Sequence, residues 1–169
     1  MMSTQSDRAT RPAQSRISAR LGIAATMLTV LLVGCGESKV AQCNKLIAVV
    51  NKGQQISQGI KGMDAPAMKK LSGDLSGLSK EIGAVELADE SLKGFQGRFT
   101  KIYSDLSTAS SKVGAALEEM EKTKKPTADS LKRLKQLQEE VTSASKMGES
   151  AAKDESSLVK EVNTYCSAK

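Results

Sequence analysis

Apolar residues recur at steps of three and four through most of the chain, and this spacing constrains the fold more than any other feature. The clearest run consists of Met68, Leu71, Leu75, Leu78 and Ile82. Residues at these steps fall on one face of an α-helix, and the alternation of three and four is typical of helices that pack side by side. No stretch of useful length alternates apolar and polar residues as a strand does. The pattern therefore predicts an all-α fold.

Capping signals divide the pattern into four segments. Asp64 has the residue type of an N-cap, and Pro66 lies in the first turn that follows it. Pro126 ends the third segment, and Thr127 can cap the fourth. Residues 83–89 either connect two helices or continue a single one. We expect helices over about residues 40–62, 64–83, 89–122 and 127–166.

Four helices with short connections favour an antiparallel up-down-up-down four-helix bundle. The expected lengths of about 23, 20, 33 and 39 residues correspond to roughly 34, 30, 50 and 58 Å. The hairpin of the third and fourth helices should therefore extend beyond the other two. In this topology the start of the first helix and the end of the fourth lie at the same end of the bundle, where Cys43 and Cys166 would meet.

The chain has three cysteines and no histidine. In an oxidising compartment Cys43 and Cys166 would form a disulfide, and the alternative is two unpaired thiols that pack as small apolar residues. Two cysteines without histidine do not suit a metal site. We expect the disulfide and no bound metal.

The first 34 residues have the organisation of an export signal. A positively charged region precedes an apolar run from Leu21 to Val33, and the sequence turns polar again at Glu37. A transmembrane helix needs roughly twenty apolar residues, so the run is too short to span a bilayer. The basic residues of the charged region are Arg8, Arg11, Arg16 and Arg20.

The apolar run ends in Leu32, Val33, Gly34 and Cys35, which resembles the lipobox of bacterial lipoproteins. The resemblance implies that residues 1–34 are a cleaved signal peptide and that Cys35 receives a diacylglycerol on its sulfur. It also implies a lipid-anchored protein of the bacterial cell envelope. Gly36 stands where an aspartate favours inner-membrane retention in enterobacterial lipoproteins, so the outer membrane, facing the periplasm, is favoured. We expect a lipidated tether over residues 35–42 and a helical bundle domain over residues 43–169.

Removal of the signal would leave 135 residues, enough for one domain with a single core. The signal holds four of the 25 basic residues and one of the 19 acidic ones, so 21 basic and 18 acidic residues remain, a net charge of +3. The basic residues are scattered among acidic ones, and no basic stripe has interleaved aromatic residues. A nucleic-acid partner is therefore not expected.

No recognisable catalytic motif is present. The absence of histidine excludes Ser-His-Asp and Cys-His systems, and Phe95, Phe99 and Ile102 share one helix face that suits a core. We expect no enzymatic activity and no cofactor.

Two functions remain open. The first is a non-enzymatic interaction or structural module of the envelope, with a protein partner at the end of the bundle that runs from Lys122 to Asp129. The alternative is a carrier or sensor of a small apolar ligand bound between the helices. A deep aliphatic cavity would favour the carrier, and a filled core with exposed apolar residues on the hairpin would favour the module.

Overall fold

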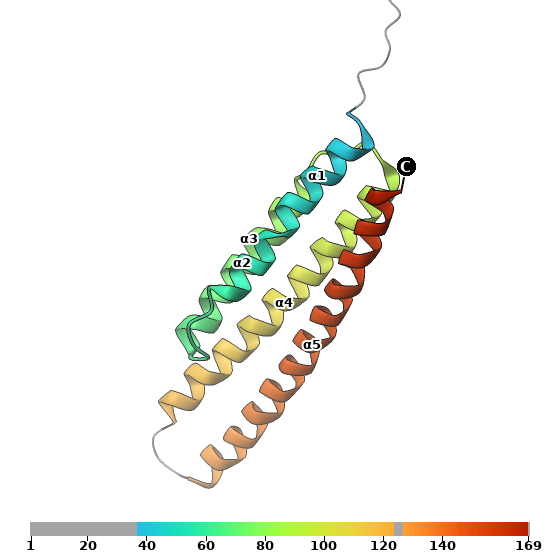
Figure 1. The fold of residues 1–169 in the computed structure, drawn as a ribbon. Coiled ribbons are helices and arrows are strands. Elements are labelled where there is room, and N and C mark those ends of the chain that lie inside the picture. Colours follow the sequence, from blue (N-terminus) through green and yellow to red (C-terminus); the bar gives the residue numbers. More distant parts are fainter. Residues whose placement is uncertain (1–36, 124–126, 169) are drawn as a thin grey trace, which may run out of the picture. The chain divides into compact units, whose positions relative to one another are not determined.

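The computed structural model describes residues 37–123 and 127–168, and all regular structure in these ranges is helical (Figure 1). Long helices pack against one another lengthwise, and consecutive ones run in opposite directions. The prediction of an all-α helical bundle is confirmed. The helices are α1 (Lys39–Val50), α2 (Lys52–Gln58), α3 (Ala65–Gly83), α4 (Glu90–Lys122) and α5 (Ala128–Ser167).

The helix boundaries follow the capping residues. The Asp64 carboxylate accepts a hydrogen bond from the Ala67 backbone N–H at 2.8 Å, and Thr127 forms a capping box with Ser130. Residues 84–89 connect α3 to α4, so this segment ends one helix and precedes another. Asp89 caps α4 by accepting from the backbone N–H of Leu92 at 2.9 Å.

The first expected helix is divided into α1 and α2, and it ends at Gln58 rather than near residue 62. The division at Asn51 lies against the buried side chain of Tyr103. A Cβ atom added to Gly53 would lie 2.1 Å from the Tyr103 hydroxyl oxygen, so only glycine lets the chain pass this close. The Val50 carbonyl oxygen lies 3.3 Å from the same hydroxyl. The division itself is slight, because Asn51 keeps helical backbone angles and its N–H donates to the Ile47 carbonyl oxygen.

The bundle begins earlier than the expected boundary at residue 43. Ser38 caps α1 by accepting from the Ala41 backbone N–H, and α1 starts at Lys39. Gln42, which we assigned to the tether, is 4 % exposed. Its side-chain oxygen accepts from the backbone N–H groups of Ala88 and Asp89 at 2.6 and 2.9 Å. Gln42 therefore belongs to the bundle and not to the expected tether, since its side chain holds the connection between α3 and α4.

The main core lies between α1 and the parts of α3, α4 and α5 that face it. Helices α3 and α5 both pack along α4, and α1 contacts all three. The largest side chains with almost no exposure gather here: Tyr103, Phe99, Leu46, Ile82, Leu92 and Leu158.

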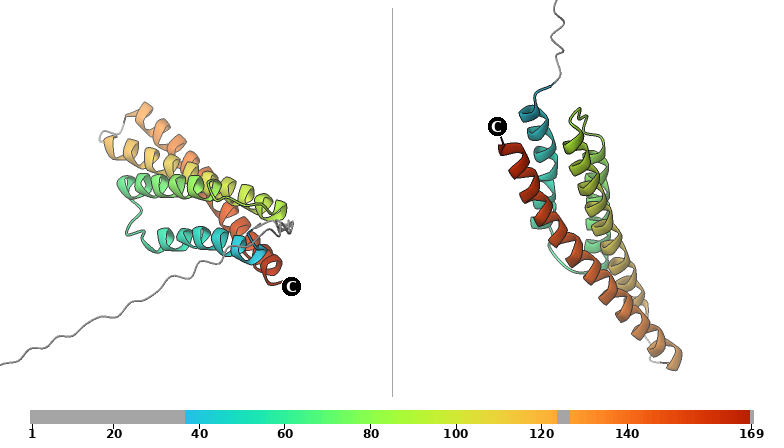
Figure 2. Two further views of the ribbon diagram at one scale, coloured as in Figure 1. Left: turned by 90° about the horizontal axis from the view of Figure 1, so that it is seen from above. Right: turned by 90° about the vertical axis from the view of Figure 1, so that its right-hand side faces the viewer.

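The α4–α5 hairpin extends beyond the rest of the bundle, as predicted (Figures 1 and 2). α4 has 33 residues and α5 has 40, whereas α3 has 19. Gly114 of α4 packs beside Met68 and Lys69, near the start of α3. The last turns of α4 therefore continue past the point where α3 begins.

Candidate functional site

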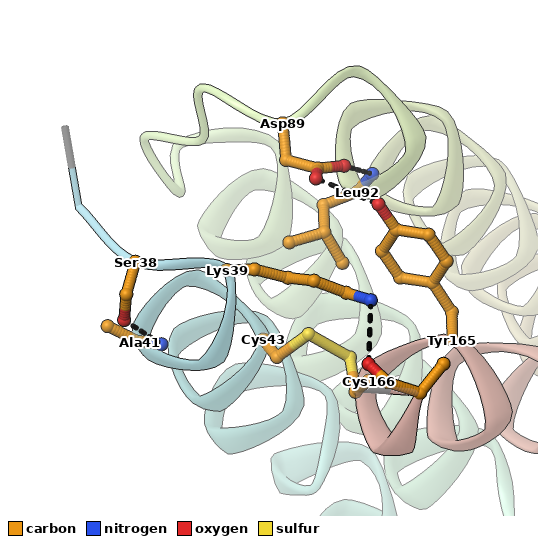
Figure 3. Close-up of a disulfide and its surroundings, with 9 residues drawn as sticks. Ser38, Lys39, Ala41, Cys43, Asp89, Leu92, Tyr165 and Cys166 are labelled. Carbon is orange, nitrogen blue, oxygen red and sulfur yellow. Dashed lines mark hydrogen bonds between the residues drawn. A yellow bond between two sulfur atoms is a disulfide. The ribbon is translucent and has the colours of Figure 1, made fainter.

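The disulfide end of the bundle joins the first turns of α1 to the last turn of α5 (Figure 3). The Sγ atoms of Cys43 and Cys166 are 2.11 Å apart, and their Cα atoms are 5.9 Å apart. The structure thus brings together the two cysteines that the topology paired. Cys35, the predicted lipidation site, lies outside the described residues.

Polar contacts around the disulfide tie the 84–89 connection to it and add further links between α1 and the end of α5. The Tyr165 hydroxyl donates to Asp89 at 2.8 Å. The Lys39 ammonium lies 4.0 Å from the centre of the Tyr165 ring and donates to the Ala168 carbonyl at 3.2 Å. The backbone N–H of Leu92 and then the Tyr165 hydroxyl lower the pKa of Asp89. These contacts hold α1, the 84–89 connection and the end of α5 together.

Tyr103 forms a second polar link in the middle of the bundle. It is 1 % exposed, and its hydroxyl donates to the carboxylate of Glu155 on α5. Burial, followed by the hydrogen bond to Glu155, raises the pKa of Tyr103. The hydroxyl therefore stays protonated and acts as a donor. This pair could not be predicted from the sequence, because 52 residues separate its members.

An open groove runs between α2 and α3. It has a volume of about 890 Å³, and its apolar lining includes Ile56, Leu71 and Leu78. The lining also contains two ion pairs, Lys52 with Glu81 and Lys70 with Asp74. A groove that is open to solvent and partly charged differs from the deep aliphatic cavity that a carrier of apolar ligands would need.

The far end of the hairpin is held by ion pairs. Arg133 of α5 donates through two nitrogen atoms to Glu119 of α4, each at 2.7 Å, and a third nitrogen donates to Glu140 at 3.1 Å. Glu118 pairs with Lys122 and with Lys69 at the start of α3. The hydrogen bond from Lys122, followed by that from Lys69, lowers the pKa of Glu118 to about 2.

Small residues line the contacts of this far half. An added Cβ at Gly148 would lie 3.9 Å from the Cβ of Ala109, and α5 is unbroken at Gly148. Ala116 and Ala144 are 2 % exposed. The alanine-rich middle of the last helix therefore permits close approach of its neighbours. Leu131, near the tip, is 58 % exposed, and residues 124–126 of the predicted partner segment lie outside the described residues.

The described ranges, 37–123 and 127–168, contain neither a candidate membrane span nor a candidate metal site. No helix there combines the length and the apolar character needed to cross a bilayer. No group of three or more acidic, cysteine or histidine side chains there is placed to hold a metal ion.

Comparison with protein-family models, with curated proteins and with solved structures finds no significant match.

Proposed function

We propose that this chain is a lipid-anchored, non-enzymatic interaction module of the bacterial cell envelope, oriented toward the periplasm. One structural observation carries the proposal. The start of α1 and the end of α5 are joined by the disulfide at one end, and the longest hairpin points away from that end. A lipid on Cys35 would therefore attach at the end opposite the hairpin tip.

The short spacing between Cys35 and α1 supports this orientation. α1 begins at Lys39, so four Cα steps separate the two residues. Even fully extended, these steps span about 14 Å. The disulfide end would thus stay close to the bilayer. The tip, at the end of helices roughly 50 to 60 Å long, would reach farthest into the periplasm.

The chemistry of the tip supports a protein contact. Leu131 presents an exposed apolar side chain one helical turn or less from the ion-paired Arg133. A protein partner at the tip would meet this apolar side chain together with the charged groups beside it. The bundle would then act as a spacer that holds this surface at a fixed distance from the membrane.

The alternative function, a carrier of a small apolar ligand, has less support. The groove between α2 and α3 offers Ile56, Leu71 and Leu78, but it is open and partly charged. In the described part of the chain every buried side-chain nitrogen or oxygen atom has a hydrogen-bond partner. No buried polar side chain there is left without a hydrogen-bond partner that a ligand could supply.

Substitution of Cys35→Ser tests the anchor. We expect the variant to accumulate as an unprocessed precursor, or as a soluble product if another peptidase cleaves it, without the added mass of acyl chains. Intact-mass measurement and detergent phase partition would detect the change. Cys166→Ser is the matched control, because it removes a different cysteine and should leave acylation intact. Unchanged mass and unchanged partition in Cys35→Ser would refute the proposal.

A further inference from the structure

Five lysines of α5 share the face that points away from the core. At 100° per residue, they all lie within about 60° of Lys146 around the helix axis. The buried residues of α5, among them Leu137, Ala144 and Leu158, lie on the opposite side. All five lysines are exposed: Lys132, Lys135, Lys146, Lys153 and Lys160.

None of these five lysines forms an ion pair with any residue that the structure describes. Most other basic side chains of the bundle do pair, and both arginines are occupied: Arg98 with Glu161, and Arg133 with Glu119 and Glu140. Three acidic residues lie within the same 60°: Glu139, Glu149 and Glu161. Arg98 of α4 pairs with Glu161. With that pair counted as neutral, five lysines and two carboxylates give the face a net charge of +3.

The linear sequence hides this face because acidic residues are interspersed along it. In the structure, some of these acidic residues contact other helices instead of the lysines. Glu155 points inward to Tyr103, and Glu161 pairs with Arg98. The lysine face extends over the 29 residues from Lys132 to Lys160, or about 42 Å along the helix. The result is a long, positively charged surface whose lysines form no ion pair within the described part of the chain.

The residue types on this face define the partner's chemistry. Lysine binds phosphate as a point charge, whereas arginine is the residue that recognises planar groups with two parallel hydrogen bonds. The face has no arginine and no aromatic residue on which a base could stack. A row of lysines without these features fits a flexible, negatively charged polymer. It would not distinguish one base sequence from another.

We infer that the lysine face of α5 binds a linear phosphate-bearing polymer of the cell envelope, which lies along the helix. A lipid surface fits less well under the orientation proposed above. The attraction of anionic headgroups falls off within about 10 Å at 0.1 M salt, so it would reach only the Lys160 end of the face. The inference relies on the proposed function for where the polymer is met, but the binding itself does not require the lipid anchor.

Binding of long-chain polyphosphate to the purified full-length protein, in an uncharged detergent, tests this inference. The first variant replaces Lys146, Lys153 and Lys160 with glutamine. The matched control replaces Lys61, Lys80 and Lys112 with glutamine; these lysines are also exposed and without ion pairs in the described part of the chain, but they lie outside α5. Each variant loses three positive charges, so the two have the same net charge.

We expect the face variant to bind roughly tenfold or more weakly than the unchanged protein, with a shallower salt dependence. The control should stay within about twofold of the unchanged protein, because the affinity comes from the lysines that neutralise phosphates, and the control leaves those of α5 in place. Equal weakening in both variants, or no binding by the unchanged protein at low salt, would overturn the inference. Preferential binding to phosphatidylglycerol vesicles over polyphosphate would overturn it in favour of a lipid surface. These results do not depend on acylation of Cys35, so they are separable from failure of the proposed anchor.

Discussion

The two ends of this bundle are built in different ways. Near the disulfide, large side chains such as Phe99, Tyr103 and Leu158 are almost fully buried between α1 and the other helices. In the far half the buried residues are mostly small, as at Ala109 and Ala144, and they lie outside the main core cluster. The first end is stabilised by apolar burial and a covalent bond, and the second by close helix approach and surface ion pairs.

This difference fits the two tasks that we propose for the bundle. The disulfide end has contacts among α1, the 84–89 connection, α4 and α5, so it would keep a fixed geometry at the proposed attachment point. The far hairpin contributes less apolar area to stability, and ion pairs at a surface contribute little. Its surface is therefore free to be shaped by contacts with other molecules.

The largest expected effect is loss of the disulfide. Cys43 and Cys166 are 123 residues apart, and in the chain-entropy account a loop of this length stabilises the fold by about 4 to 5 kcal/mol. Replacing both with serine should lower the urea midpoint clearly. Reductant should lower the midpoint of the unchanged protein and leave that of the variant unaltered. Two thiols that alkylate freely in protein isolated without reductant would show that the bridge does not form.

A leucine pair on α5 compares the two halves directly. Leu158 lies in the main core cluster and is 0 % exposed, and Leu137 lies outside the cluster and is 1 % exposed. We expect Leu158→Ala to reduce the free energy of unfolding by about 4 kcal/mol and Leu137→Ala by about 2 kcal/mol, because the far half can close around the lost volume. Chemical denaturation measures both. A larger loss for Leu137→Ala would reverse the comparison.

Replacing one glycine by alanine in each half should change the stability of the fold in opposite directions. Gly53→Ala places a Cβ against the buried Tyr103 ring, so it should destabilise by about 1 to 3 kcal/mol. Gly148→Ala meets only an ordinary contact with Ala109, and alanine should stabilise α5 by about 0.5 to 1 kcal/mol. Melting temperatures of the two variants would show the difference. A stabilising Gly53→Ala would mean that Tyr103 does not fill this space.

The smallest effect concerns acid. The pKa of Glu118 is lowered from 4.5 to about 2 by Lys122 and then Lys69. The unfolded chain therefore binds a proton that the folded chain does not, and the stabilisation present above pH 4.5 is lost as the pH falls toward about 2. The effect should be modest because the group is exposed. Glu118→Gln should flatten the fall in urea midpoint between about pH 5 and pH 2, and an unaltered profile would contradict this role.

Features set by local chemistry could be predicted from the sequence. Asp64 and Thr127 cap helices through side-chain contacts with residues three positions on, and the steps of three and four identified the core faces of α3 and α4. The meeting of Cys43 and Cys166 followed from antiparallel topology alone. These features depend on neighbours in the sequence or on the number of helices.

Features set by distant contacts could not be predicted. The close packing of Tyr103 against Gly53, beside the division at Asn51, could not be predicted because 50 residues separate the two. Gln42 is buried by hydrogen bonds to a connection 46 residues away. The lysine face of α5 was missed for a related reason, since the pairing of Glu161 with Arg98 is visible only in three dimensions.

The orientation of the bundle is the central claim, and site-specific photo-crosslinking in intact cells tests it most directly. A photoreactive residue at Ala128 would lie at the hairpin tip, and one at Glu86 would lie in the 84–89 connection beside the disulfide end. Both positions are exposed. We predict that Ala128 captures protein and that lipid capture is confined to Glu86. Preferential capture of lipid at Ala128 would contradict an anchor at the disulfide end and a tip that points away from the membrane.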